Sequence, residues 1–335
     1  MSTRREPTKG IENPSAAKDG ITVVIPTFNR EELLKRAIVS ALNQTVKPEQ
    51  VIVVDDGSTD GTPEMCGKFA HSIEYVRQAN AGAAEARNHG IRLARHEWIA
   101  FLDSDDYWTP THLERMLAAI KDTFGQASFY FSDVFMDNGT RDATLWSRIG
   151  FKVEGSCQLS PDATDWMLSR GVPASIQSTV FNAAVLKASG GFDGRFEVME
   201  DTELFLRLGI GGNVCAVNTV GCFYTADDKT HNRLTTKVNA WTENHGKCSC
   251  RLWRLVDSQF PNLDPSRRKI IFNNLAESYW RLSRCYWRSG RVHHSIIPFL
   301  RCIKTEPRML ITLFRRRMST RRQKEVSGPV SQPES

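Results

Sequence analysis

Two short apolar runs, each followed at once by acidic residues, constrain the fold of this chain more than any other feature. Residues 51–54 read Val-Ile-Val-Val and precede Asp-Asp-Gly-Ser, and residues 98–102 read Trp-Ile-Ala-Phe-Leu and precede Asp-Ser-Asp-Asp. A run that is apolar throughout is typical of a strand buried on both faces of a parallel sheet. Because the carboxyl ends of parallel strands meet at one edge, we expect the two acidic segments to lie close together there.

Predicted strands and helices alternate along the first hundred residues. Apolar runs indicate the strands, and apolar residues at helical spacing indicate the helices between them. The expected elements are, in chain order, 21–25, 31–42, 51–54, 62–70, 73–76, 81–93 and 98–102. This alternation predicts an α/β fold with a mostly parallel sheet, flanked by helices and joined by right-handed crossovers. Residues 126–240 are more mixed, and from residue 241 the pattern changes to helices rich in Arg, Trp and Tyr.

Composition excludes several classes of protein. The 335 residues are 40% hydrophobic and 24% charged, which is typical of a globular chain of about two domains. The apolar stretches are all shorter than the roughly 18 residues of a membrane span, and the polar start does not resemble a secretory signal. The eight cysteines form no CxxC pair, so we expect reduced thiols in a cytoplasmic protein rather than zinc or disulfide chemistry.

The segment Asp103-Ser-Asp105 carries the first chemical prediction. Carboxylates gathered at one sheet edge repel one another unless a cation joins them. Paired carboxylates suit Mn²⁺ or Mg²⁺, which prefer hard oxygen ligands and bridge phosphates. The alternative is that these residues only form turns, where Asp is common.

Several motifs, in their order and spacing, resemble those of the family-2 glycosyltransferases with the GT-A fold. They are Val-Val-Ile-Pro-Thr-Phe-Asn-Arg at 23–30, Val-Val-Asp-Asp-Gly-Ser-Thr-Asp at 53–60, Asn80-x-Gly82 with Ala86-Arg-Asn88, Phe-Leu-Asp-Ser-Asp-Asp at 101–106, Gly190-Gly-Phe-Asp193 and Glu200-Asp201. The resemblance covers about residues 20–235. It implies a bacterial enzyme of this family with an added basic helical segment at its C-terminal end.

Together with the sequence patterns, the resemblance divides the chain into five predicted parts. They are a flexible leader (1–20), a nucleotide-sugar-binding α/β half (21–125), the acceptor-side part of the same catalytic domain (126–240), a basic helical segment (241–320) and a disordered tail (321–335).

The resemblance also implies roles for individual residues. Asp105 would be the main metal ligand under the diphosphate, Asp103 would reach the ribose or the metal, and Asp201 would be the general base with Glu200 as its neighbour. Asp56 would accept a hydrogen bond from the edge of the uracil or other base, and Phe28 would lie near the base. The residues implied in nucleotide-sugar binding are Pro26, Thr27, Phe28, Asn29, Arg30, Asp56, Arg87, Asp103, Ser104 and Asp105.

The expected reaction moves a sugar from a nucleotide-diphosphate donor, with UDP favoured, to a hydroxyl of a glycan or lipid-linked acceptor of the cell surface. The leaving diphosphate is anionic, and a bound divalent cation would neutralise it. The acceptor hydroxyl is a poor nucleophile and needs a carboxylate to take its proton. Attack from the far side inverts the anomeric carbon and requires one such base.

Each assignment has a structural alternative. Asp201 begins a predicted helix and could serve only as a cap or dipole partner, and Glu200 could serve only as an ion-pair partner. Arg87 could be a solvated charge, and Phe28 could simply pack. His231 falls where some GT-A enzymes carry a flexible loop, and it is either a free loop histidine or a third metal ligand.

The C-terminal part is strongly basic. Residues 241–335 contain 19 Lys and Arg against 7 Asp and Glu. Arg315–Arg317 and Arg321–Arg322 flank an apolar segment at 310–314, a pattern that favours an anionic membrane surface and a peripheral location at its inner face. A soluble helical appendage is the alternative. Nucleic acid is not expected, because no recognised binding motif accompanies the charge.

Competing functions make different demands on the chain. A Rossmann dehydrogenase or methyltransferase would place a glycine-rich loop after the first strand, where this chain has Pro-Thr-Phe-Asn-Arg. A non-catalytic sugar-nucleotide-binding or scaffold protein of the same fold stays open as the non-enzymatic alternative. The three carboxylates Asp103, Asp105 and Asp201 count against it.

Overall fold

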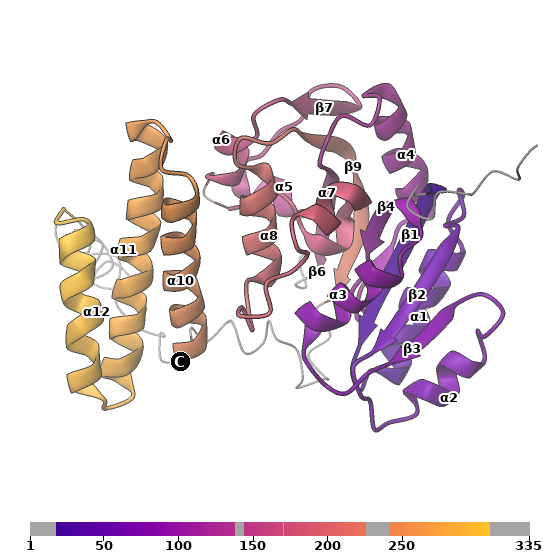
Figure 1. The fold of residues 1–335 in the computed structure, drawn as a ribbon, viewed down its shortest axis with the longest axis horizontal. Coiled ribbons are helices and arrows are strands. Elements are labelled where there is room, and N and C mark those ends of the chain that lie inside the picture. Colours follow the sequence, from indigo (N-terminus) through magenta and orange to yellow (C-terminus); the bar gives the residue numbers. More distant parts are fainter. Residues whose placement is uncertain (1–17, 138–143, 170, 226–241, 309–335) are drawn as a thin grey trace, which may run out of the picture.

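The computed structural model describes residues 18–137, 144–169, 171–225 and 242–308. A single sheet runs through the first three of these ranges, with helices on both of its sides, and a row of three helices follows (Figure 1). Its strands are β1 Lys18–Thr27, β2 Gln50–Asp55, β3 Glu74–Arg77, β4 His96–Phe101, β5 Tyr107–Trp108, β6 Phe129–Asp137, β7 Cys157–Ser160, β8 Thr179–Asn182 and β9 Val214–Thr225.

The N-terminal half of the sheet is parallel. The strand order is β3-β2-β1-β4-β8-β6-β9-β5, with β7 beside β9, and β1 pairs in parallel with both β2 and β4. The connecting helices are α1 Glu31–Leu42, α2 Thr62–Gly67 and α3 Ala83–Leu93. Thr27 lies opposite Asp55 in the register, so β1 and β2 end at the same edge. The expectation of an α/β sheet flanked by helices is confirmed.

The all-apolar strands are explained by a core on each face of the sheet. Val24 and Phe101 belong to one core, which includes apolar residues of α3. Val23 and Ile25 belong to the other, which includes the buried face of α1. Because successive side chains of a strand point to opposite faces, burial of both faces requires apolar residues at every position.

The second half of the sheet is mixed. β8 lies between β4 and β6 and is antiparallel to both, whereas β6 and β9 are parallel. The helical segments of this half are α4 His112–Asp122, α5 Leu145–Ile149, α6 Thr164–Met167, the 3₁₀ turn η1 Ile176–Ser178, α7 Ala183–Ala188 and α8 Glu200–Gly209.

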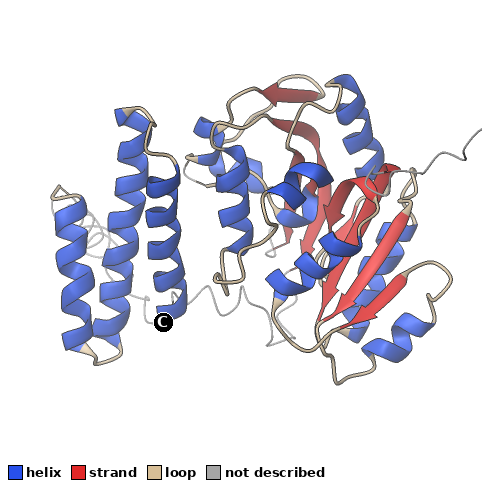
Figure 2. Cartoon of the chain, viewed as in Figure 1, coloured by secondary structure: helices blue, strands red, loops and turns tan. Residues whose placement is uncertain are grey.

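The last described range forms three helices, α10 Glu243–Gln259, α11 Pro265–Arg288 and α12 Val292–Thr305 (Figure 2). α10 and α12 both pack on α11, and α10 also contacts α8. Asp264 caps α11 by accepting the backbone N–H groups of Ser266 and Arg267, and Pro265 occupies the first turn, where its missing N–H costs nothing. None of the described helices combines the length and the apolar character needed to cross a bilayer.

The ends of the predicted parts lie mostly outside the described residues. β1 begins at Lys18, which is inside the segment expected to be a leader, and extends beyond the predicted strand through Pro26 to Thr27. The segment around His231, the apolar and arginine-rich stretch at 310–322 and the tail at 321–335 fall outside the described ranges. The five-part division of the chain stays a prediction.

Candidate active site

Three carboxylates follow the end of β4. Oxygen atoms of Asp103, Asp105 and Asp106 all lie within 4.8 Å of one another. A tight turn gathers them, in which the backbone N–H of Asp106 donates to the carbonyl of Asp103 at 3.0 Å. Asp103 and Asp105 were expected here, whereas Asp106 was not singled out, although it is adjacent in the sequence.

Two arginines face this acidic cluster. Arg30 Nη1 lies 2.7 Å from Asp105 Oδ2, and Arg87 Nη2 lies 2.7 Å from Asp103 Oδ1. Asp106 Oδ1 accepts the backbone N–H of Thr225 at 3.0 Å, which ties the end of β9 to the cluster. Carboxylate oxygens gathered this closely form the donor set that Mg²⁺ and Mn²⁺ prefer, so these residues fit a divalent cation.

Arg87 connects the acidic cluster to the helix that carries Asp201. Its Nη1 lies 2.7 Å from Glu200 Oε1, and its guanidinium carbon lies 5.3 Å from the centre of the Phe192 ring. The residue is only 4% exposed. Burial alone would lower the pKa of Arg87, but Asp103 and Glu200 together hold that pKa above its usual range. Burial raises the pKa of Glu200, with Arg87 acting against this shift.

Asp201 lies in the first turn of α8, directly after Glu200. Its Oδ1 accepts the backbone N–H of Thr202 at 2.6 Å and the hydroxyl of the same residue at 3.2 Å. Met199, the residue before the helix, has a φ of 69°, in the left-handed region that side chains rarely adopt. The helix N-terminus stabilises negative charge at this position.

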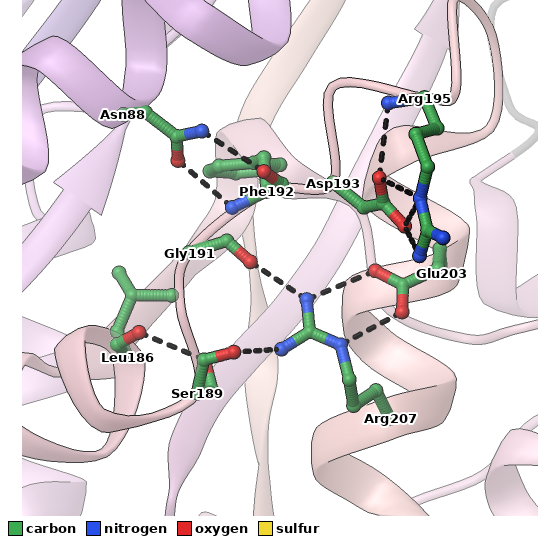
Figure 3. Close-up of polar contacts among 9 residues, drawn as sticks. All are labelled: Asn88, Leu186, Ser189, Gly191, Phe192, Asp193, Arg195, Glu203 and Arg207. Carbon is green, nitrogen blue, oxygen red and sulfur yellow. Dashed lines mark hydrogen bonds and ion pairs between the residues drawn. The ribbon is translucent and has the colours of Figure 1, made fainter. Parts of the chain in front are cut away.

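The Gly190–Asp193 loop is held in place by α3 and α8 (Figure 3). Asn88 accepts the backbone N–H of Phe192 at 2.8 Å and donates to its carbonyl at 2.9 Å. Arg207 donates to the carbonyl oxygens of Ser189 and Gly191 at 2.7 and 2.6 Å and also pairs with Glu203. The loop that the resemblance assigns to the acceptor side is therefore rigidly attached to the helix that carries Arg87.

Gly191 is required at its position. Its φ is +70°, and a Cβ atom there would lie 2.4 Å from Asn88 Oδ1. Any side chain would therefore strain the backbone and displace the Asn88 amide that holds the loop.

The end of β1 and the loop after it place five predicted residues at the same edge of the sheet. Pro26 and Thr27 are buried, whereas the Phe28 ring is 42% exposed. Asn29 has a φ of 52°, and its side-chain oxygen accepts the backbone N–H of Thr59 at 2.7 Å. Arg30 pairs with the acidic cluster as described above. The exposed Phe28 ring is therefore available to stack on a ligand.

The two acidic residues at the end of β2, Asp55 in the strand and Asp56 directly after it, have protein partners. Asp55 is fully buried and accepts hydrogen bonds from Ser58 and Tyr75. Asp56 accepts bonds at 2.8 Å from Gln78 Nε2 and the backbone N–H groups of Ala81 and Gly82. A carboxylate has about four acceptor positions, of which these bonds occupy three. Asp56 is only 4% exposed, and its contact with a base stays a prediction.

Sequence reasoning missed Arg36. This residue of α1 donates to the backbone carbonyl of Asp105 at 2.8 Å and to the Thr225 hydroxyl at 2.7 Å, and it lies over the Tyr107 ring. Its place on a helix before the motif gave no signal of this contact.

Ser104, predicted to bind the nucleotide, is only 3% exposed. The structure thus gathers Arg30, Arg87 and the acidic cluster, while the roles predicted for these residues stay predictions.

Comparisons with known proteins match part of the chain to glycosyltransferases. Residues 22–165 match the family described as glycosyl transferase family 2. The glucosyltransferase WfaP of Escherichia coli, named as acting from UDP-Glc on α-D-GlcNAc-diphosphoundecaprenol, is 33% identical over 124 residues, which are 36% of this chain and 49% of WfaP. The chain spans between 15% and 49% of the length of the first curated relatives that it matches.

Solved structures share the fold. TarS 1–349 of S. aureus in complex with UDP-GlcNAc has a TM-score of 0.57 at 16% identity, over 88% of this chain and 92% of that one. The mannosyltransferase PcManGT of Pyrobaculum calidifontis, in complex with GDP-Man and Mn²⁺, has a TM-score of 0.55 at 16% identity, over 92% of this chain and 87% of that one. At these identities the likeness shows the fold alone.

Proposed function

We propose, from the match of residues 22–165 to glycosyl transferase family 2, that the chain is a member of this family and transfers a sugar from a nucleotide-diphosphate donor to a hydroxyl group with inversion of the anomeric carbon. One observation supports this more than any other. The acidic cluster at the end of β4 is joined through the buried Arg87 to Glu200, the residue before Asp201. Two ion pairs of 2.7 Å thus connect the residues proposed for the donor side with those proposed for the acceptor side.

The proposed mechanism assigns separate tasks to the two sides. Asp103 and Asp105, with Asp106 beside them, would hold a divalent cation, which supplies positive charge to the leaving diphosphate. Arg30 adds positive charge on the same side, since it already pairs with Asp105. Phe28, exposed on the loop after β1, would stack on the base, and the remaining acceptor position of Asp56 would receive a hydrogen bond from the base edge.

Asp201 is the proposed general base. Its carboxylate takes the proton of the acceptor hydroxyl as the oxygen bonds to the anomeric carbon. The bond to the diphosphate breaks on the opposite side, and its electron pair leaves with the nucleoside diphosphate. One displacement inverts the anomeric centre. The Asn88-held Gly190–Asp193 loop would position the acceptor.

UDP is the favoured donor nucleotide, and a lipid-linked glycan is the favoured acceptor. TarS was solved with UDP-GlcNAc, and WfaP is named for UDP-Glc and a diphosphoundecaprenol-linked sugar. PcManGT, in contrast, was solved with GDP-Man and Mn²⁺. A lipid-linked acceptor would place this enzyme in the cytoplasm at the inner face of the membrane, in the synthesis of a cell-surface polysaccharide.

Thermal unfolding of the full chain with nucleotides tests the donor site. A ligand that binds the native state raises its apparent stability by mass action. We expect UDP with Mn²⁺ or Mg²⁺ to raise the melting temperature, UDP without metal to raise it less, and GDP to have a smaller effect. The Asp105→Asn variant should fold but lose the metal-dependent part of the shift.

Other outcomes would contradict the proposal or favour its alternative. A shift with NAD or S-adenosylmethionine alone would exclude the sugar-nucleotide site. Metal-dependent UDP binding without hydrolysis or transfer, in a screen of nucleotide sugars and acceptors, would favour a non-catalytic sugar-nucleotide-binding protein.

A further inference from the structure

The three C-terminal helices form a cavity that the proposed reaction does not use. It lies where α10 and α12 flank α11 and has a volume of about 240 Å³. We call it the bundle groove. Lys247, Arg251 and Arg254 of α10 and Arg301 of α12 line it, and Cys250 and Tyr279 are among its buried lining residues.

The cations come from two helices and face one space. Lys247, Arg251 and Arg254 are spaced by four and three residues, which places them on one face of α10. Arg301 approaches from α12, with its guanidinium carbon 5.9 Å from the centre of the Tyr279 ring. Burial raises the pKa of the Cys250 thiol to about 12, while Arg254 and Arg301 act in the opposite direction.

The positive charge of the bundle groove is only partly neutralised. Lys247 pairs with Glu243 at 2.7 Å, but Glu243 does not line the groove. Arg254 donates to the carbonyl of Cys250, and Arg251 to the carbonyl of Arg195. Within the described part of the chain, no carboxylate forms an ion pair with Arg251, Arg254 or Arg301. The four cations are exposed, so an anion from solution or from a membrane surface can reach them, and it would offset the repulsion among the three arginines.

An exposed apolar strip borders the bundle groove on α12. Ile296, Ile297 and Leu300 are 52%, 60% and 58% exposed and lie on one face of the helix, next to Arg301. Residues 281–308 contain seven Arg and Lys but one acidic residue. The same strip on a second copy of this chain would bring like charges together, which disfavours self-association through it.

We propose that the bundle groove binds the phosphate headgroup of an anionic membrane lipid, with the apolar strip of α12 lying against the hydrocarbon region of that lipid surface. Guanidinium groups bind phosphate oxygens through paired N–H donors, and apolar side chains beside a basic cluster favour the interface of an anionic bilayer. The site is formed by helices outside the residues that match the family, so it does not depend on the proposed reaction.

Vesicle co-sedimentation of the full chain tests this site. Phosphatidylglycerol vesicles are compared with phosphatidylcholine vesicles, and inorganic pyrophosphate is titrated calorimetrically in parallel. The test variant is Arg254→Glu with Arg301→Glu. The matched control is Arg284→Glu with Arg288→Glu, which makes the same change in charge at exposed residues of α11 that do not line the groove.

We expect the test variant to lose phosphatidylglycerol binding by about tenfold or more and the control by no more than about threefold. Arg301→Lys should retain most of the binding, and thermal melts should show that all variants fold. The wild type could bind pyrophosphate but not vesicles, and the test variant could lose the pyrophosphate binding. These results together would support an anion site but overturn the proposal that its ligand is a membrane lipid. Equal loss in the test and control variants would overturn the site itself.

Discussion

Arg87 connects the two halves of the candidate site through its ion pairs with Asp103 and Glu200. It is a buried cation between two carboxylates, one on the turn after β4 and one at the start of α8. Burying charges is costly, and the cost is offset only when all partners are present with good geometry. Removing the cation would leave the buried Glu200 and the partly exposed Asp103 without their counter-charge.

The Arg87→Met variant should lose about 3–5 kcal/mol of unfolding free energy, because the buried carboxylate of Glu200 and the partly exposed carboxylate of Asp103 both lose their partner. Urea denaturation measures this loss. Arg92→Met is the matched control, since Arg92 is an exposed residue of the same helix, and it should change stability by no more than about 0.5 kcal/mol. Similar losses of unfolding free energy in the two variants would show that the ion pairs of Arg87 with Asp103 and Glu200 do not have this importance.

The Asp201→Asn variant should reduce the transfer rate by about 10²-fold or more, because an amide cannot take the acceptor proton. Metal-dependent UDP affinity, measured by calorimetry, should be unchanged and serves as the internal control. If Asp201 acts only through its hydrogen bond to Thr202 and the helix dipole, the variant will melt at a lower temperature but transfer sugar at the normal rate.

His112 should make the protein less stable below neutral pH. The residue is fully buried, and neither of its ring nitrogens has a hydrogen-bond partner in the described part of the chain. Burial lowers the pKa of His112 to about 3, from an ordinary value of 6.5. Below pH 6.5 the unfolded chain therefore binds a proton that the folded chain does not, and stability falls as the pH falls towards 3.

Because of His112, the free energy of unfolding should fall by about 1.4 kcal/mol for each pH unit below 6.5. Urea denaturation of the wild type and of His112→Leu at pH 7.5 and 5.5 isolates it, because all other titrating groups are common to both chains. The wild type should lose more stability than the variant by about 1.4 kcal/mol. Equal losses would show that His112 does not remain neutral in the folded chain.

At the scale of elements, α3 connects the two sides of the site. It lies directly against β1, presents Arg87 to the acidic cluster and presents Asn88 to the Gly190–Asp193 loop. This close approach depends on Gly90, where a Cβ atom would lie 2.2 Å from Val24 Cγ1. A shift of this helix would therefore move both sides of the site together.

The Gly90→Ala variant should lose about 1–3 kcal/mol of stability, because the added methyl group overlaps the side chain of a central strand. It should also weaken metal-dependent UDP binding, since α3 must move away from β1. Gly67→Ala is the control: that glycine ends α2, a Cβ atom there would meet nothing within 4 Å, and a small gain is expected. If both variants melt at a lower temperature than the wild type, or both at a higher one, this account is contradicted.

At the scale of the whole molecule, the C-terminal helices are packed into the rest of the protein. Leu252 of α10 and Ile271 of α11 belong to the same core as Phe205 of α8. Arg267 of α11 also pairs with Asp162 and Asp165 near α6. Two of the three helices that line the bundle groove, α10 and α11, therefore share a core with the sheet, so a headgroup bound there would also orient the sheet edge relative to the membrane.

Much of the N-terminal half follows from local sequence. Strands such as 51–54 are recognisable because burial on both faces demands an apolar residue at every position, and the acidic residues after them must lie at the carboxyl edge of a parallel sheet. The helices expected at 31–42 and 81–93 are recognisable from the helical spacing of their apolar residues, and the structure has them as α1 and as α3, which begins two residues later at Ala83. These features depend on residues that are neighbours in the chain.

Tertiary structure decided what depends on distant residues. The antiparallel insertion of β8 between β4 and β6, the two-residue strand β5 and the contact of Arg36 with the turn after β4 have no local signature. The pairing of Arg87 with Glu200 joins residues 113 positions apart. The charges that line the bundle groove converge only because two helices pack on a third, and periodicity within one helix cannot specify its partner.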